Sequence, residues 1–119
     1  MPKQDQLKSE QAKWLYVTLS STDEAKTIAK ALVTDRLVAC ANILGDIQSV
    51  YWWDGAVQEE TEVAMVLKTR ASLVSKVTAR ITQLHSYDCP CVVALDIADG
   101  HPEYLKWIFK ETEQYADKV

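Results

Sequence analysis

The residues of this sequence best suited to bind a metal ion are two closely spaced cysteines and the histidine before them. Cys89 and Cys91 flank a proline, and in an extended segment side chains two residues apart face the same way. Both sulfurs can therefore approach one soft cation such as Cu(I), and His85 can add an imidazole. The same spacing is equally typical of two small residues at the start of a strand, so both interpretations stay open.

The third cysteine, Cys40, stands alone in an apolar segment, where a lone cysteine is more often a small buried hydrophobe than a ligand. The chain has 3 cysteines, an odd number, and its first residues, Met1 to Ala12, are polar and charged without an apolar signal region. This combination predicts free thiols in the cytoplasm and no disulfide framework.

Catalytic chemistry has weaker support in the sequence. Glu59, Glu60 and Glu62 supply carboxylates, but neighbouring residues on a strand point to opposite faces and no nucleophile stands nearby. We interpret these glutamates as a solvated strand. Neither His85 nor His101 belongs to an H-E-x-x-H pattern, and the sequence has no Gly-rich phosphate loop or G-x-S-x-G elbow. We therefore expect no enzymatic activity.

Composition excludes two classes of partner. The formal net charge is -4 and the pI is near 5.1, which argues against the clustered basic surface that nucleic acid requires. No apolar run approaches the length of about 20 residues that spans a bilayer. We expect neither nucleic acid nor a membrane as a partner.

The pattern of the first half predicts a strand, a helix and a long hairpin. Residues 14–19 are typical of a buried strand, and apolar residues at helical spacing follow from Ala25. Residues 37–53 predict one long strand bent at Gly45, and Asp54-Gly55 is a strong signal for a two-residue hairpin turn. The returning strand alternates apolar and polar side chains up to Leu67.

The second half predicts a helix over residues 71–84, a strand over 91–97 and a last helix that begins near Pro102. The order is βαββαβα. With helices on one face of an antiparallel sheet, this order describes an α+β, ferredoxin-like sandwich. We expect a flexible tail over residues 1–12 and a single domain over 13–119.

The predicted hairpin is longer than a strand pair of ordinary size and ends in an aromatic cluster. Tyr51, Trp52 and Trp53, together with Tyr104 and Trp107, carry more ring area than a small domain absorbs easily. An interface between copies is the natural place for these rings. A stacking platform for bases would need a basic groove, which the acidic composition disfavours. The candidate trimer-interface residues are Tyr51, Trp52, Trp53 and Gly55.

Several motifs occur together in one order, namely RLVACANIL at residues 36–44, YWWDG at 51–55, Glu62 followed by LKT at 67–69, LHSYDCP at 84–90 and YLKW at 104–107. On these motifs the chain resembles the CutA family, from about Trp14 to the last helix. The resemblance implies a ferredoxin-like subunit in a tight homotrimer built through the long hairpin, an architecture similar to that of the PII signalling proteins. It also implies tolerance of copper and other divalent cations.

Residue by residue, the resemblance extends to candidate sites. Cys40 matches the cysteine of the family's ACAN-like motif, which is linked with copper binding. His85 and Tyr87 match an H-P-Y motif, and Ser86 replaces its proline, which loosens the backbone before the tyrosine. Cys89 and Cys91 stand where the family commonly has apolar, small or acidic residues. The candidate ligands of copper or another divalent metal ion are therefore Cys40, His85, Cys89 and Cys91.

The resemblance further implies a cleft between subunits, and its candidate residues are Glu62, Lys68, Tyr87, Tyr104 and Trp107. Two alternatives to metal tolerance remain at this point. The first alternative is a PII-like sensor of a small ligand, for which Arg36, Lys68 and Arg70 are candidate anion donors. The second is a structural trimer that supports another protein.

Overall fold

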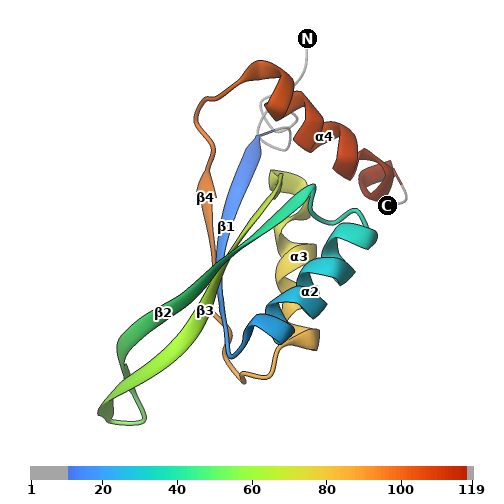
Figure 1. Cartoon of the computed structure of the whole chain (residues 1–119). Coiled ribbons are helices and arrows are strands. Elements are labelled where there is room, and N and C mark those ends of the chain that lie inside the picture. The colour runs from blue at the N-terminus through green and yellow to red at the C-terminus, as the bar shows by residue number, and fades with distance from the viewer. Residues whose placement is uncertain (1–10, 118–119) are drawn as a thin grey trace.

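A four-stranded antiparallel sheet organises residues 11–117, the part of the chain that the computed structural model describes (Figure 1). The strands are β1 (Ala12–Leu19), β2 (Cys40–Trp53), β3 (Ala56–Arg70) and β4 (Val92–Asp96). The helices are α2 (Thr22–Thr34), α3 (Val74–Leu84) and α4 (Pro102–Asp117), with a 3-10 turn at Ala71–Leu73. The strand order β2-β3-β1-β4 is that of a ferredoxin-like α+β fold, which confirms the expected architecture.

The core lies between the sheet and two helices. Figure 1 shows α2 and α3 packed on one face of the sheet. Alternate residues of β1 and β3 belong to the hydrophobic core between this face and the helices. Leu15, Val17, Met65 and Leu67 are completely buried there. α2 begins cleanly because the Oγ of its N-cap residue, Ser21, accepts a 3.1 Å hydrogen bond from a first-turn N–H.

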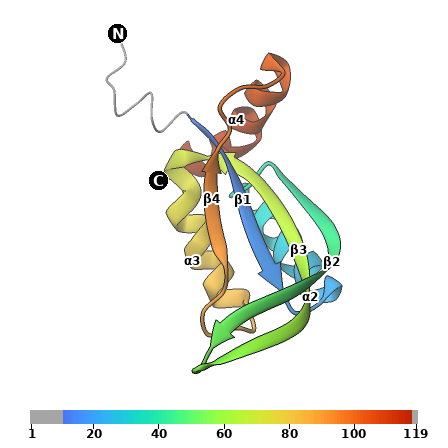
Figure 2. The same ribbon diagram turned by 90° about the vertical axis from the view of Figure 1, so that its left-hand side faces the viewer.

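The β2–β3 hairpin extends beyond the two helices, as both views show (Figures 1 and 2), and it gives the chain extents of 52 × 27 × 26 Å. Its turn uses Asp54 at φ 53° and Gly55 at φ 77°, the pair of positive φ angles that a type I′ turn requires. The register shifts between Ile43 and Gly45, where φ is 110°. The predicted turn and the predicted bend are both confirmed.

Polar contacts fasten α4 to the rest of the domain. The buried guanidinium of Arg70 donates a 2.9 Å hydrogen bond to the Thr112 hydroxyl and another to the Phe109 carbonyl. Arg36 lies 3.0 Å from a carboxylate oxygen of Glu111. These two arginines were candidates for holding an anion in a cleft, and the structure uses both to hold this helix.

The other face of the sheet has no helix of residues 11–117 packed over its centre (Figure 2). Trp14 and Tyr16 of β1 lie opposite Leu95 and Val93 of β4 on this face. Leu95 is 53% exposed and Val93 50% exposed, whereas core residues of the same sheet are buried. We call this surface the open face. Between residues 11 and 117, no helix combines the length and the apolar character needed to cross a membrane.

The expected boundaries differ slightly from the observed ones. Residues 1–10 of the expected tail lie outside the described residues. Ala12, placed in that tail, is already the first residue of β1, where it is buried and lies opposite Arg70. β2 begins at Cys40 and not at Leu37. The side chain of Leu37 is buried in the core ahead of the strand.

Candidate functional site

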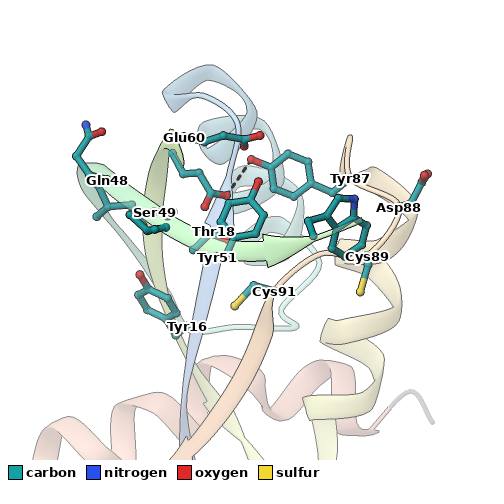
Figure 3. A pocket seen from close by; sticks show the side chains of 14 residues that line it. Tyr16, Thr18, Gln48, Ser49, Tyr51, Glu60, Tyr87, Asp88, Cys89 and Cys91 are labelled. Atoms are coloured by element: carbon teal, nitrogen blue, oxygen red, sulfur yellow. Dashed lines mark hydrogen bonds between the residues drawn. The ribbon is translucent and has the colours of Figure 1, made fainter. Parts of the chain in front are cut away.

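A cavity of about 830 Å³ opens on the open face, between the hairpin and the segment that precedes β4 (Figure 3). The walls come from β1, from both strands of the hairpin and from residues 87–91. Aromatic rings, carboxylates, hydroxyls and two thiols line it. The lining therefore offers hydrogen-bond donors and acceptors beside the two thiols.

A tyrosine and a glutamate from distant parts of the chain meet in this cavity. The hydroxyl of Tyr87 donates a 2.9 Å hydrogen bond to Oε2 of Glu62, drawn as a dashed line in Figure 3. Burial, together with this carboxylate, raises the pKa of Tyr87 well above the ordinary value for a phenol. Glu62 is only 7% exposed, so the interpretation of this residue as part of a solvated strand is wrong.

A second tyrosine, Tyr51, lies beside a second glutamate, Glu60. In Figure 3 the hydroxyl groups of Tyr51 and Tyr87 point towards the same part of the cavity. Burial and the Glu60 carboxylate both raise the pKa of Tyr51. The phenols therefore remain neutral hydrogen-bond donors at physiological pH, and the cavity presents their hydroxyls beside carboxylates.

His85 contacts the segment that carries Tyr87, and its side chain is 0% exposed. Nε2 lies 2.8 Å from the Thr18 carbonyl oxygen, and Nδ1 lies 3.1 Å from the Tyr87 backbone nitrogen. Because a carbonyl can only accept and an amide N–H can only donate, the proton of the neutral ring sits on Nε2. The ring thus links the backbone of β1 at Thr18 to the backbone at Tyr87.

Glu24 is a supporting residue that the sequence did not reveal as part of a site. Its Oε2 accepts a 2.9 Å hydrogen bond from the Ser86 N–H, and its Oε1 accepts bonds from the backbone and hydroxyl of Ser20. Burial raises the pKa of Glu24, but these hydrogen bonds outweigh burial and hold the pKa below its ordinary value. Its place in the first turn of α2 was visible, whereas its partner 62 residues away was not.

The four candidate metal ligands do not converge within the chain. Cys89 and Cys91 both line the cavity, and Figure 3 shows their sulfur atoms apart on the same wall. Cys40 lies on β2 at the opposite edge of the sheet, with its sulfur 3.6 Å from Asn42 Oδ1. His85 uses both ring nitrogens as described above. Among residues 11–117, no three His, Cys, Asp or Glu side chains are grouped to hold a metal ion.

The five cleft candidates fall into two groups within one chain. Glu62 and Tyr87 share the cavity, whereas Lys68, Tyr104 and Trp107 lie at the far end of β3. The ammonium of Lys68 is 3.0 Å from the Tyr104 hydroxyl, and the Tyr104 and Trp107 ring centroids are 5.5 Å apart. A shallow hollow of about 640 Å³ borders these two rings.

The candidate interface residues lie at the end of the hairpin. Trp52 is 74% exposed and Trp53 is 56% exposed, and Gly55 occupies the turn beyond them. Tyr51 and Trp53 also line the cavity, whereas Trp52 does not. Trp52 and Trp53 thus leave more than half of their surface exposed at the end of the hairpin in the described part of the chain.

The fold and the site together define a class of protein, namely a ferredoxin-like domain with an extended hairpin, an open face and a cavity beside the hairpin. A family model described as CutA1 divalent ion tolerance protein matches residues 13–111. The divalent-cation tolerance protein CutA of Pyrococcus horikoshii is 39% identical over 100 residues, which cover 84% of this chain and 97% of that protein. This chain belongs to the CutA family.

Solved structures agree with this assignment. The divalent cation tolerance protein CutA1 of Thermus thermophilus is similar with a TM-score of 0.83 and 42% identity, covering 85% of this chain and 98% of that one. CutA of Archaeoglobus fulgidus, described as periplasmic, is similar with a TM-score of 0.82 and 39% identity at the same coverage. Some relatives are longer, and the chain spans 58% of the length of the mouse protein CutA.

Proposed function

We propose that this protein is a cytoplasmic, non-enzymatic homotrimer that confers tolerance of copper or another divalent metal ion by binding it. The observation that carries the proposal is a pair of free thiols, Cys89 and Cys91, on the cavity wall of a chain whose relatives are named divalent-cation tolerance proteins. Cys89 is exposed and Cys91 is half-buried, so both are accessible to an incoming ion.

The open face supports the homotrimer. Leu95 and Val93 expose about half of their surface beside Trp14 and Tyr16, and the hairpin carries two further exposed tryptophans. Contiguous apolar surface of this kind is rarely left to solvent, and a stable interface buries roughly 800 Å² on each partner. A second and third copy of the chain are the partners that the family resemblance favours.

Thiol chemistry favours copper over hard cations. Thiolate sulfur is a soft ligand that binds Cu(I) well, whereas Mg²⁺ and Ca²⁺ require several oxygen ligands. Two thiolates suffice for Cu(I) in a linear arrangement, and other ligands would come from the carboxylates of the cavity or from a neighbouring copy. Cys40 remains a separate candidate because it lies at the other edge of the sheet.

An anaerobic Cu(I) titration against a competing chelator tests this function. Exchange of both Cys89 and Cys91 for alanine should weaken copper binding at least about tenfold, and Cys40→Ala separately tests the candidate ligand outside the cavity. Binding should also weaken as pH falls, because protons compete for the sulfur. Unchanged copper affinity in the triple Cys→Ala variant, still assembled, would exclude thiol ligation.

The absence of catalysis is part of the proposal. His85, the histidine nearest the cavity, uses both ring nitrogens to hold backbone groups and is not free to act as a general base. The phenols of Tyr51 and Tyr87 have raised pKa values, which makes them poor nucleophiles near neutral pH. We expect assays for hydrolysis and phosphoryl transfer to detect no turnover.

A small-ligand sensor is the second candidate, and the cavity volume of about 830 Å³ favours it. Native mass spectrometry of protein taken directly from cells separates the candidates, because it reports the mass of the assembly together with any retained metal or metabolite. A retained metabolite favours the sensor, a retained metal favours tolerance by binding, and an assembly with neither favours a structural trimer.

A further inference from the structure

Cys89 and Cys91 are free thiols on either side of Pro90, in a segment without helix or strand. Residues 86–89 form a bend, and β4 begins only at Val92. Among residues 11–117, neither thiol has a hydrogen-bond partner. The two sulfur atoms can therefore change position by side-chain rotation and by a local change in a short connecting segment.

The spacing of these cysteines brings them within reach of a disulfide. Residues two apart in an extended chain have Cα atoms about 6.6 Å apart, at the upper end of the range of about 4.4–6.8 Å found in disulfides. Figure 3 shows the two sulfur atoms apart on one wall of the cavity, which is the reduced form of the pair.

Pro90 favours a conformation that shortens this distance. In a β-turn that starts at Cys89, Pro90 occupies the second position, where proline is preferred because its φ is fixed near −65°. Such a turn brings the Cα atoms of Cys89 and Cys91 closer together than an extended segment does. The sequence between the two thiols is thus compatible with both a reduced, extended form and a bridged, turned form.

The surroundings of the pair select the kind of oxidant. Cys89 is exposed, whereas Cys91 is half-buried, so an oxidant reaches Cys89 first. Asp88, Glu60 and Glu62 line the same cavity, and none of the described residues that line it is a lysine, an arginine or a histidine. Because like charges repel, a neutral peroxide approaches these thiols more easily than the anionic glutathione disulfide does.

We propose that Cys89 and Cys91 form a reversible redox site, in which a peroxide oxidises Cys89 and Cys91 converts the product to a disulfide. The Cys89 thiolate attacks one oxygen of hydrogen peroxide, the O–O bond breaks, and the hydroxide takes up the thiol proton and leaves as water. The Cys91 thiolate then attacks the sulfenic sulfur, the S–OH bond breaks, and a second water leaves in the same way. Two thiols and one peroxide give one disulfide and two waters.

Oxidation and copper binding exclude each other at this site, because both use the same two sulfur atoms. This consequence rests on the proposed function, whereas formation of the disulfide does not. Oxidised protein should bind Cu(I) at least about tenfold more weakly than reduced protein, and treatment with a dithiol should restore the affinity.

Peroxide treatment of the metal-free, full-length protein tests the redox site. Intact-mass spectra should show the loss of two hydrogen atoms from each chain, and peptide maps should place the bond between Cys89 and Cys91. Cys40→Ala is the control that keeps the pair, and it should oxidise like the wild type. In Cys91→Ser, dimedone should trap a sulfenic acid on Cys89 at least about tenfold more than in the wild type.

A second oxidant tests the selection by charge. In the same time and at equal concentration, glutathione disulfide should produce at least about tenfold less of the bond than hydrogen peroxide does. A bond formed equally fast by both reagents would overturn the assignment of a neutral oxidant.

Other outcomes separate the redox site from the copper function. Sulfinic or sulfonic acid on Cys89 in place of the bond, a disulfide between two chains, or equal dimedone labelling of wild type and Cys91→Ser would overturn the redox site. Thiols that bind copper but do not form the bond would overturn it as well, while the copper function stands. A bond that forms and leaves the copper affinity unchanged would instead overturn thiol ligation of copper, while the redox site stands.

Discussion

The hydroxyl of Tyr87 lies 2.9 Å from Oε2 of Glu62, and this hydrogen bond joins the segment before β4 to the hairpin. The imidazole of His85 packs against the ring of Tyr87, and the two ring centroids lie 4.5 Å apart. The backbone of that segment is in turn held by Glu24 through the Ser86 N–H. The cavity therefore depends on contacts that connect three separate parts of the chain.

Alkaline stability tests the environment of Tyr87. Its folded-state pKa is raised, so between the unfolded pKa near 10 and the higher folded value the unfolded chain loses a proton that the folded chain keeps. The stabilisation is complete below about pH 10 and is lost as pH rises above it. Tyr87→Phe should flatten this alkaline decline in the unfolding free energy, measured by urea melts from about pH 8 to 11.

Tyr16→Phe is the control for that experiment, because within residues 11–117 its hydroxyl makes no hydrogen bond. An equal alkaline slope in wild type and Tyr87→Phe would contradict the assigned environment.

Acid stability tests Glu24. Its folded-state pKa is lowered, so its stabilising contribution is present above the ordinary value of 4.5 and is lost as pH falls through the folded value. Glu24→Gln should lower the unfolding free energy at pH 7 by about 1 to 2 kcal/mol and reduce its acid dependence. The neighbouring first-turn residue Asp23, which is exposed, provides the control Asp23→Asn. Identical acid profiles for Glu24→Gln and wild type would refute this role.

The hairpin turn tests the positive φ of Gly55. A β-branched residue is strained at φ 77°, so Gly55→Val should cost about 1 to 2 kcal/mol and weaken assembly through the displaced tryptophans. Gly55→Asn is the matched variant, because asparagine tolerates left-handed angles. Thermal melts and sedimentation report the two effects, and equal behaviour of the two variants would show that backbone strain is not the cause.

The open face tests the homotrimer. Leu95 is 53% exposed in the single chain, so Leu95→Asp should leave the subunit folded yet raise the dissociation constant of the assembly at least about tenfold. Val33 on α2 is 42% exposed and lies on the helical side, which makes Val33→Asp the matched control. Light scattering after size exclusion measures the mass. Equal dissociation in both variants would place the interface elsewhere.

The amino-acid sequence by itself determined the order and type of the elements. Residues 14–19 carry the apolar run of a buried strand and residues 57–67 the alternation of a half-buried one. The helices follow from apolar residues at helical spacing, because these patterns arise from the local geometry of the backbone. The turn at Asp54-Gly55 is equally local, since only a few residue types adopt positive φ without strain. Family membership followed from motifs that are visible along the chain.

Only the tertiary structure decided how the site is assembled. Glu62 looked like one of three solvated glutamates, yet register places it opposite Ile47 in the cavity, within reach of Tyr87. His85 looked free to bind a metal ion, yet both ring nitrogens are used by backbone groups. The physical reason is that burial and hydrogen-bond partners depend on strand pairing between residues far apart in the chain, which local spacing does not encode.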